Sequence, residues 1–108
     1  MTYKPAQRLG DIAHTRSGDK GNRANIGVVA FDSEGYARLS EQLTESVVAE
    51  YLKPLHPGKV RRYELPNILA LNFVIDDALG GGASRSLRLD TQGKALGVAL
   101  LELQLPAL

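Results

Sequence analysis

The 108-residue sequence contains no cysteine and no tryptophan, and aromatic residues make up only 6% of it. Without cysteine the chain cannot form disulfides, use thiol chemistry or bind zinc through thiolates. Sparse aromatic residues argue against a platform on which nucleic-acid bases stack. The formal charge of +1 provides no strong positive field, so we expect no nucleic-acid partner.

Long apolar runs are also missing. No stretch approaches the roughly 20 apolar residues of a membrane-spanning helix, and Met1–Pro5 has no apolar signal core. We therefore expect a cytoplasmic protein without membrane contact. Apolar residues at 44% and charged residues at 23% are typical of a folded globular chain. A chain of this length suits one hydrophobic core, so we predict a single domain over residues 1–108.

The patterns that are present alternate between strand and helix. The apolar periodicity predicts strands over 8–15, 25–31, 59–65, 68–75 and 102–105, with helical patterns over 36–55 and from Asp90 to about Leu103. Thr44 followed by Glu45 indicates an internal cap that would divide the first helical stretch near Leu43. Without the first strand, the order is βαββαβ. We predict an α+β, ferredoxin-like antiparallel sheet with two helices on one face and an extra N-terminal strand, paired with its neighbour or lying at an edge.

A polar stretch, residues 14–25, separates the first two predicted strands and is interpreted as a loop. Gly18 and Gly21 would allow successive backbone N–H groups to point inward, as in a nest that binds an anion. Arg16, Lys20 and Arg23 would add positive charge. The alternative, a rigid turn in which polar side chains cap loop amides, stays open.

A second candidate segment, Leu79–Ser86, contains three consecutive glycines followed by hydrogen-bond donors suited to a carboxylate or phosphate. The alternative is a plain flexible connection. In βαββαβ this segment leaves a central strand antiparallel to the one that the polar stretch enters. We therefore expect the two segments to emerge at the same end of the sheet.

Several other polar residues can be interpreted either as structural or as functional. Asn72 interrupts an apolar strand, and we expect a buried amide that bonds neighbouring loops or contacts a ligand. Arg61 and Arg62 are interpreted as the solvated face of a strand. His14 and His56 lack metal-ligand spacing, and we expect neither a metal nor a cofactor. The predicted ligand-binding residues are Arg16, Ser17, Gly18, Lys20, Asn22, Asn25, Asn72, Gly81, Gly82, Arg85 and Ser86.

Several motifs together resemble the AtuA-like ferredoxin-fold domain, over about residues 8–105. They are Arg16-Ser17-Gly18-Asp19-Lys20-Gly21-Asn22, Asn25-Ile26-Gly27, Leu71-Asn72-Phe73, Ala78-Leu79-Gly80-Gly81-Gly82, Ser86-Leu87-Arg88 and Gln92-Gly93-Lys94 with Leu100-Leu101. In that family the domain is a small separate protein or the C-terminal part of a larger acyclic terpene utilisation protein. The resemblance implies a separate larger AtuA-type subunit as partner. It also implies a link to acyl-CoA or terpenoid-acid metabolism.

These observations leave two functional hypotheses. The first is an accessory or binding module whose 16–25 and 79–88 loops hold an anion, such as part of a CoA thioester, or a partner protein. The second is half of a composite active site acting on a CoA thioester, with Asp19 and Lys20 as an acid–base pair. A homo-oligomer formed through a bare sheet face is compatible with either hypothesis.

Overall fold

The computed structural model describes residues 6–20, 23–53, 58–76 and 100–107. Its elements are β1 (Gln7–Arg8), the 3-10 helix η1 (Leu9–Asp11), β2 (Ala13–Lys20), β3 (Arg23–Ala30), α1 (Ser33–Gln42), α2 (Glu45–Tyr51), β4 (Val60–Leu65), the 3-10 helix η3 (Pro66–Ile68), β5 (Ala70–Asp76) and β6 (Gln104–Leu105).

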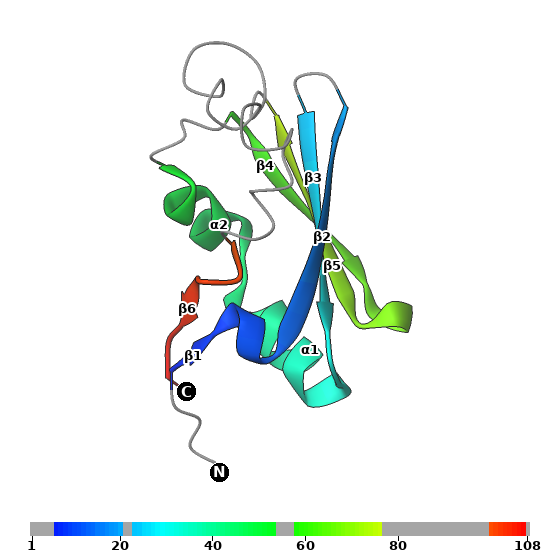
Figure 1. Ribbon diagram of the computed structural model, residues 1–108, viewed down its shortest axis with the longest axis vertical. Helices are drawn as coiled ribbons and strands as arrows, with labels where there is room; N and C mark the ends of the chain where they lie inside the picture. Colours follow the sequence, from blue (N-terminus) through cyan, green and yellow to red (C-terminus); the bar gives the residue numbers. More distant parts are fainter. Residues whose placement is uncertain (1–5, 21–22, 54–57, 77–99, 108) are drawn as a thin grey trace.

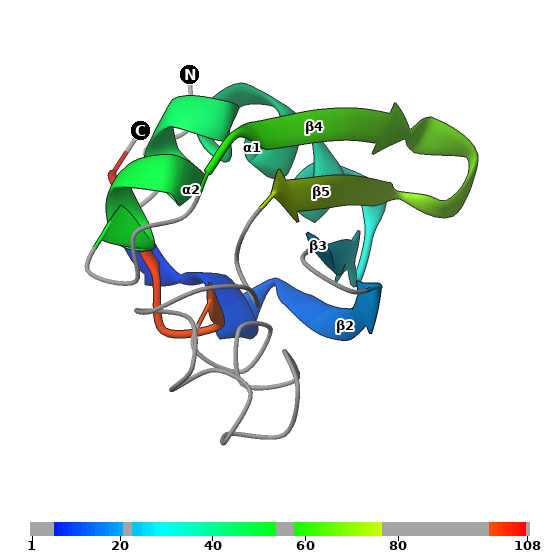
Figure 2. The same cartoon turned by 90° about the horizontal axis from the view of Figure 1, so that it is seen from above.

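Four of the strands form one antiparallel sheet in the order β2-β3-β5-β4. Both α1 and α2 lie on the same side of this sheet, as Figures 1 and 2 show from two directions. The arrangement confirms the α+β, ferredoxin-like fold. The extra N-terminal strand, β2, pairs with β3 and forms one edge of the sheet, as predicted.

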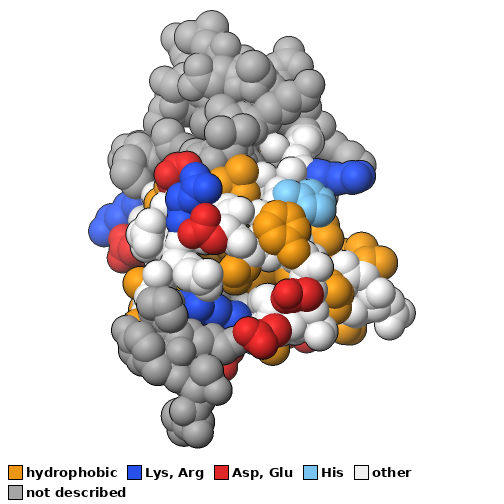
Figure 3. Space-filling model, turned by 60° about the horizontal axis from the view of Figure 1, so that its bottom comes forward, with side chains coloured by type: hydrophobic (Ala, Val, Ile, Leu, Met, Phe, Trp, Pro, Cys, Tyr) orange, Lys and Arg blue, Asp and Glu red, His pale blue; other side chains and the backbone are white. Residues whose placement is uncertain are grey.

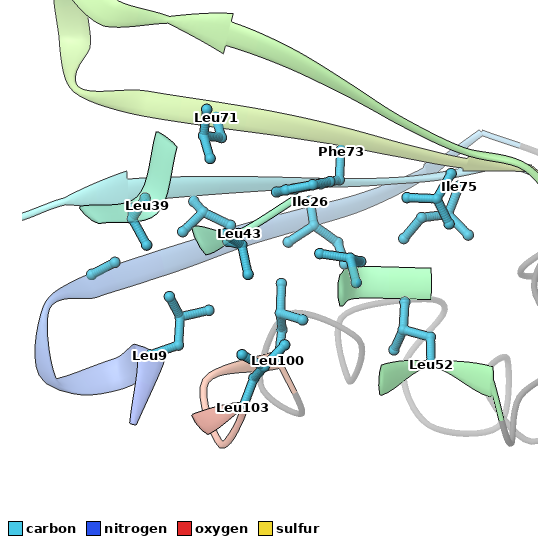
Figure 4. Close-up of a cluster of buried hydrophobic side chains, with 14 of the residues drawn as sticks. Leu9, Ile26, Leu39, Leu43, Leu52, Leu71, Phe73, Ile75, Leu100 and Leu103 are labelled. Atoms are coloured by element: carbon cyan, nitrogen blue, oxygen red, sulfur yellow. The ribbon is translucent and has the colours of Figure 1, made fainter. Parts of the chain in front are cut away.

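The core lies between the sheet and the helices. Alternate residues of β3 and β5 point into it, including Ile26 and Phe73, which have no exposed surface. Leu39 and Leu43 of the helical stretch come from the other side (Figure 4). Val48 of the same stretch is also fully buried in this cluster. Burying each such side chain contributes about 1.5–3 kcal/mol.

The helical stretch is divided as the sequence predicts. Asp32 precedes α1, and its Oδ1 accepts a hydrogen bond from the backbone N–H of Gly35 at 2.8 Å. Thr44 precedes α2, and its Oγ1 accepts one from the backbone N–H of Val47 at 3.2 Å. Each bond satisfies an N–H that has no partner within the helix, so the two caps fix where the helices begin. The internal break near Leu43 is therefore confirmed.

Arg62 of β4 joins the sheet to this break. Its Nη1 donates to the carbonyl oxygens of Ser40 at 3.1 Å and Leu43 at 2.9 Å, which lie at the end of α1. Glu45 in turn accepts the backbone N–H of Arg62 at 2.7 Å. A guanidinium at the C-terminal end of a helix interacts favourably with the partial negative charge there. The Glu45 carboxylate provides an acceptor for a backbone N–H of the edge strand β4. The interpretation of Arg62 as a solvated residue was wrong.

The two ends of the described chain form a separate two-stranded sheet, in which β1 pairs with β6. Arg38, only 4% exposed, donates to Gln7 at 2.7 Å, to Gln42 at 2.8 Å and to the carbonyl of Pro106 at 2.8 Å. One buried guanidinium therefore links α1 to both ends of the described chain. At the surface, a hydrogen bond from Arg8 to Glu102 at 2.8 Å, with the charge of that carboxylate, raises the pKa of Arg8.

Several sequence predictions need correction or lie outside the described residues. The predicted strand 8–15 is broken by η1, and β2 begins only at Ala13. The strand predicted at 68–75 begins at Ala70, because Pro66 opens η3 and Leu69 adopts a left-handed conformation with φ 57°. The second helical stretch, from Asp90, lies outside the described residues apart from its end, where Leu100 is fully buried.

Candidate functional site

The candidate site lies on the face of the four-stranded sheet that points away from α1 and α2, which we call the outer face. Neither helix covers it (Figure 1). In an antiparallel sheet, residues directly opposite on neighbouring strands share a face, so the pairing register gives its layout. The described outer-face residues on the four strands are His14, Arg16, Gly18, Arg23, Asn25, Gly27, Val29, Arg61, Tyr63, Leu65, Ala70, Asn72, Val74 and Asp76.

One row across the sheet brings predicted site residues together. Arg16 of β2 lies opposite Gly27 of β3, which lies opposite Asn72 of β5, and Asn72 lies opposite Tyr63 of β4. Arg16 and Tyr63 are exposed, and Asn72 is half-buried. A cation, an amide and an aromatic ring from three strands therefore flank one glycine in the middle of the open face.

Two glycines, Gly18 and Gly27, leave gaps in the layer of side chains on the outer face. Gly18 lies opposite Asn25 in the next row, and a Cβ atom added at Gly18 would have no heavy atom within 4 Å. A Cβ added at Gly27 would meet only the carbonyl oxygen of Arg16, at 3.8 Å. Both glycines leave open space above the backbone, so a bound group can approach the sheet closely beside Arg16.

An ion-pair cluster closes the hairpin end of the outer face. The Asp76 carboxylate accepts from Nη2 of Arg61 at 2.8 Å and from Nε of Arg23 at 3.1 Å. Two cations thus share one carboxylate. The Nε of Arg61 is buried and has no hydrogen-bond partner among the described residues. The cluster retains one net positive charge, and Arg16 supplies another on the same face.

The opposite end of the outer face is apolar. His14 of β2 stacks on Phe31, which follows β3, with ring centroids 5.9 Å apart. Figure 3 shows the described histidine against a hydrophobic side chain at the surface. Phe31 is 60% exposed, and Leu65, in the same row as His14, is 43% exposed. Among these residues, this end has no lysine, arginine, aspartate or glutamate side chain.

The structure gathers some of the predicted site residues and separates others. Arg16, Gly18, Asn25 and Asn72 share the outer face. Ser17 lies opposite Ile26, on the face toward the helices, and does not belong to this group. Asp19 and Lys20 end β2 opposite Ala24 and Arg23. The side chains of Asp19 and Lys20 lie outside the described residues, as do Asn22, Gly81, Gly82, Arg85 and Ser86.

Two interpretations of these residues were wrong. Residues 16–20 and 23–25 are not a loop, because they form the paired ends of β2 and β3. The backbone groups of a strand point alternately to its two sides, so these residues do not form a nest of converging amides. Asn72 is not buried in the core, because its neighbours Leu71 and Phe73 point to the helices and Asn72 points away from them.

Sequence reasoning missed Tyr63, Asp76 and Arg61 as neighbours of the site. The sequence of β4 does not show which of its two faces points to the core, because each face carries an arginine. One face consists of Val60, Arg62 and Glu64, and the other of Arg61, Tyr63 and Leu65. The long stem of Arg62 lets its guanidinium reach the helix end from the inner face. Only the pairing of β4 with β5 places Tyr63 beside Asn72.

The other features of the described residues concern metal sites, membrane spans and grooves. Within the described parts of the chain, no three histidine, cysteine, aspartate or glutamate residues are grouped so that they could hold a metal ion. None of the described helices is long and apolar enough to span a membrane. A groove of about 350 Å³ lies on the helix side, between α2 and the segment around β6, lined by Ser46, Val47, Glu50, Tyr51, Leu103 and Gln104.

Comparison with known proteins agrees with the fold. The sequence model of the AtuA ferredoxin-like domain matches residues 7–106, from β1 to just beyond β6. The chain belongs to this family. No curated protein and no solved structure matches it significantly. In this chain the four-stranded sheet of the domain therefore has an outer face that neither described helix covers, with a basic end near the β2–β3 hairpin and an apolar end near Phe31.

Proposed function

We propose that this AtuA ferredoxin-like domain is an accessory binding module that acts with a larger AtuA-type subunit in acyl-CoA or terpenoid-acid metabolism. One observation carries the proposal. Arg16 and Asn72, 56 positions apart in the sequence, flank the bare backbone of Gly27 on an open sheet face. On the described outer face these hydrogen-bond donors have no serine, threonine or cysteine nucleophile beside them, which suits binding more than bond breaking.

The group bound at the basic end is anionic. Arg16 presents a planar set of donors that matches a carboxylate or phosphate, and the amides of Asn25 and Asn72 provide additional donors. Arg23 and Arg61 add positive charge that Asp76 only half compensates. A carboxylate of the larger subunit and a CoA thioester or other small anion share this chemistry.

Two binding measurements separate these sources. Calorimetry of the domain alone with a CoA thioester tests the small anion, and calorimetry with the full-length larger subunit tests the protein. Binding in either titration that weakens in the Arg16→Ala variant supports the proposal. Folded domain that binds neither probe contradicts it.

A composite active site is the second candidate function. It keeps Asp19 and Lys20 as an acid–base pair at the end of β2, on the same strand as Arg16. The complex with the larger subunit would then turn over a CoA thioester, and Asp19→Asn would abolish turnover without unfolding the domain. Unchanged turnover in that variant would remove this candidate. Light scattering of the domain alone tests the expected homo-oligomer in the same samples.

A further inference from the structure

The described outer face has the composition of a protein interface. Among the described residues, four of the five exposed large hydrophobic residues lie on this face or at its apolar end, namely Phe31, Tyr63, Leu65 and Ile68, and the fifth is Tyr51. The described side chains on its four strands include three arginines and no glutamate, and the pairing of Lys20 with Arg23 places one lysine position at the basic end. Interfaces favour arginine and aromatic residues and disfavour lysine and glutamate. An antiparallel sheet face in permanent contact with water is normally polar along its whole length, whereas one end of this face is apolar.

The charges on this face are segregated. The basic end carries Arg16 and the cluster in which Arg61 and Arg23 share Asp76. The apolar end carries Phe31 stacked on His14, with Leu65 in the same row as His14. A complementary surface must therefore place carboxylates at one end and apolar side chains at the other.

This segregation disfavours a second copy of the chain as the occupant. A two-fold axis parallel to the strands would stack the basic end of one copy on the basic end of the other. A two-fold axis across the strands would cover the arginines of each copy with the apolar end of its partner. The first arrangement opposes like charges, and the second buries cations without counter-charges.

We propose that the outer face docks onto an acidic and apolar surface of the larger AtuA-type subunit. Carboxylates of that surface pair with Arg16 and with the Arg61–Asp76–Arg23 cluster, and its apolar side chains cover Tyr63, Leu65 and Phe31. The inference rests on the proposed function and deepens it, because it specifies the chemistry of the partner surface and assigns one whole face of the sheet to it.

The test is titration of the full-length larger subunit with the domain at several salt concentrations. Two variants address the two ends, Arg16→Glu for the charge and Tyr63→Ser for the apolar contact. Matched controls lie on α2 and just beyond it: Lys53→Glu makes the same charge change at a residue whose side chain is 79% exposed, and Tyr51→Ser removes another exposed tyrosine. Circular dichroism establishes that each variant is folded.

The expected result is an affinity at least about tenfold lower for Arg16→Glu and for Tyr63→Ser, no change for the two controls, and weaker binding as salt rises. Equal affinity for all four variants, or an affinity that does not change with salt concentration, overturns this inference but does not contradict the proposed function. Absence of any complex with folded wild-type domain removes both. A dimer of the domain alone that Tyr63→Ser dissolves assigns the face to a second copy and also overturns the inference.

Discussion

Arg23 and Asp76 lie opposite one another at the hairpin end of the sheet, and the Nε of Arg23 donates to Oδ1 of Asp76 at 3.1 Å. Arg23 opens β3 and Asp76 ends β5, so this pair fixes where two distant parts of the sequence meet. The β2–β3 hairpin within the polar stretch and the point where the chain leaves β5 therefore lie at the same end of the sheet, as predicted from the sequence.

Replacing Asp76 by asparagine tests the shared carboxylate. The change removes the two ion pairs that Arg61 and Arg23 make among the described residues. We expect the domain to lose about 1 kcal/mol of unfolding free energy, because the pairs are only half-buried. The same change raises the net positive charge of the basic end. Affinity for an anionic partner should therefore increase, and calorimetry with the larger subunit measures it.

The control is Asp11→Asn, which removes an exposed carboxylate 3.5 Å from Arg8 and away from the outer face. It should change neither stability nor affinity appreciably. Lower affinity in Asp76→Asn would contradict the assignment of an anionic group to this end, since it would mean that the aspartate itself is what the partner recognises.

Gly27→Val separates stability from binding. The new side chain has room, because a Cβ at Gly27 meets only one atom, at 3.8 Å. Glycine inside a strand costs roughly 0.5–1 kcal/mol, and valine favours strands, so the urea midpoint should stay the same or rise. A fall of several kcal/mol in unfolding free energy would show that the space above Gly27 is occupied in the folded domain.

Arg38 is expected to be the most costly polar residue to remove. It is 4% exposed and donates to Gln7, Gln42 and Pro106. Arg38→Met should lower the unfolding free energy by about 2–4 kcal/mol, because three part-buried hydrogen bonds from one charged group are lost together. Arg38→Lys should recover only part of the loss, since an ammonium cannot reach three acceptors in the geometry of a guanidinium. Full recovery by lysine in urea unfolding would contradict this account.

The internal helix cap gives a smaller and independent effect. Thr44→Ala removes the acceptor for the Val47 N–H and should cost about 1 kcal/mol in urea unfolding, whereas Thr44→Ser keeps the hydroxyl and should cost little. Equal losses in the two variants would show that the methyl group of Thr44, and not its hydrogen bond, is what stabilises α2.

The sequence was sufficient for elements whose periodicity is strong. The β-branched run at 25–31 and the apolar run ending at Ile75 became the two central strands, and Thr44 divided the helices where its cap chemistry indicated. The polar stretch misled, because β2 is an edge strand with Thr15 and Ser17 on its inner side in place of apolar residues. A strand with polar residues on both faces lacks the alternation of apolar and polar residues by which strands are predicted, so its sequence is interpreted as a loop.

The candidate site was predictable only in part. Arg16, Gly18, Asn25 and Asn72 were selected from their chemistry, and the register brings them onto one face. The contribution of Tyr63 and Asp76 depends on cross-strand pairing, which no local pattern encodes. The family match supports the fold over residues 7–106.

The central claim is that the outer face is the binding surface, and the most direct measurement compares wild type, Gly27→Val and Ala37→Val in calorimetric titrations of the larger AtuA-type subunit. Ala37→Val introduces the same valine side chain, by adding two methyl groups, at an exposed position of α1 away from the outer face. We predict that Gly27→Val, although as stable as wild type, binds at least about tenfold more weakly, while Ala37→Val binds normally. Equal affinity for all three proteins would contradict the claim.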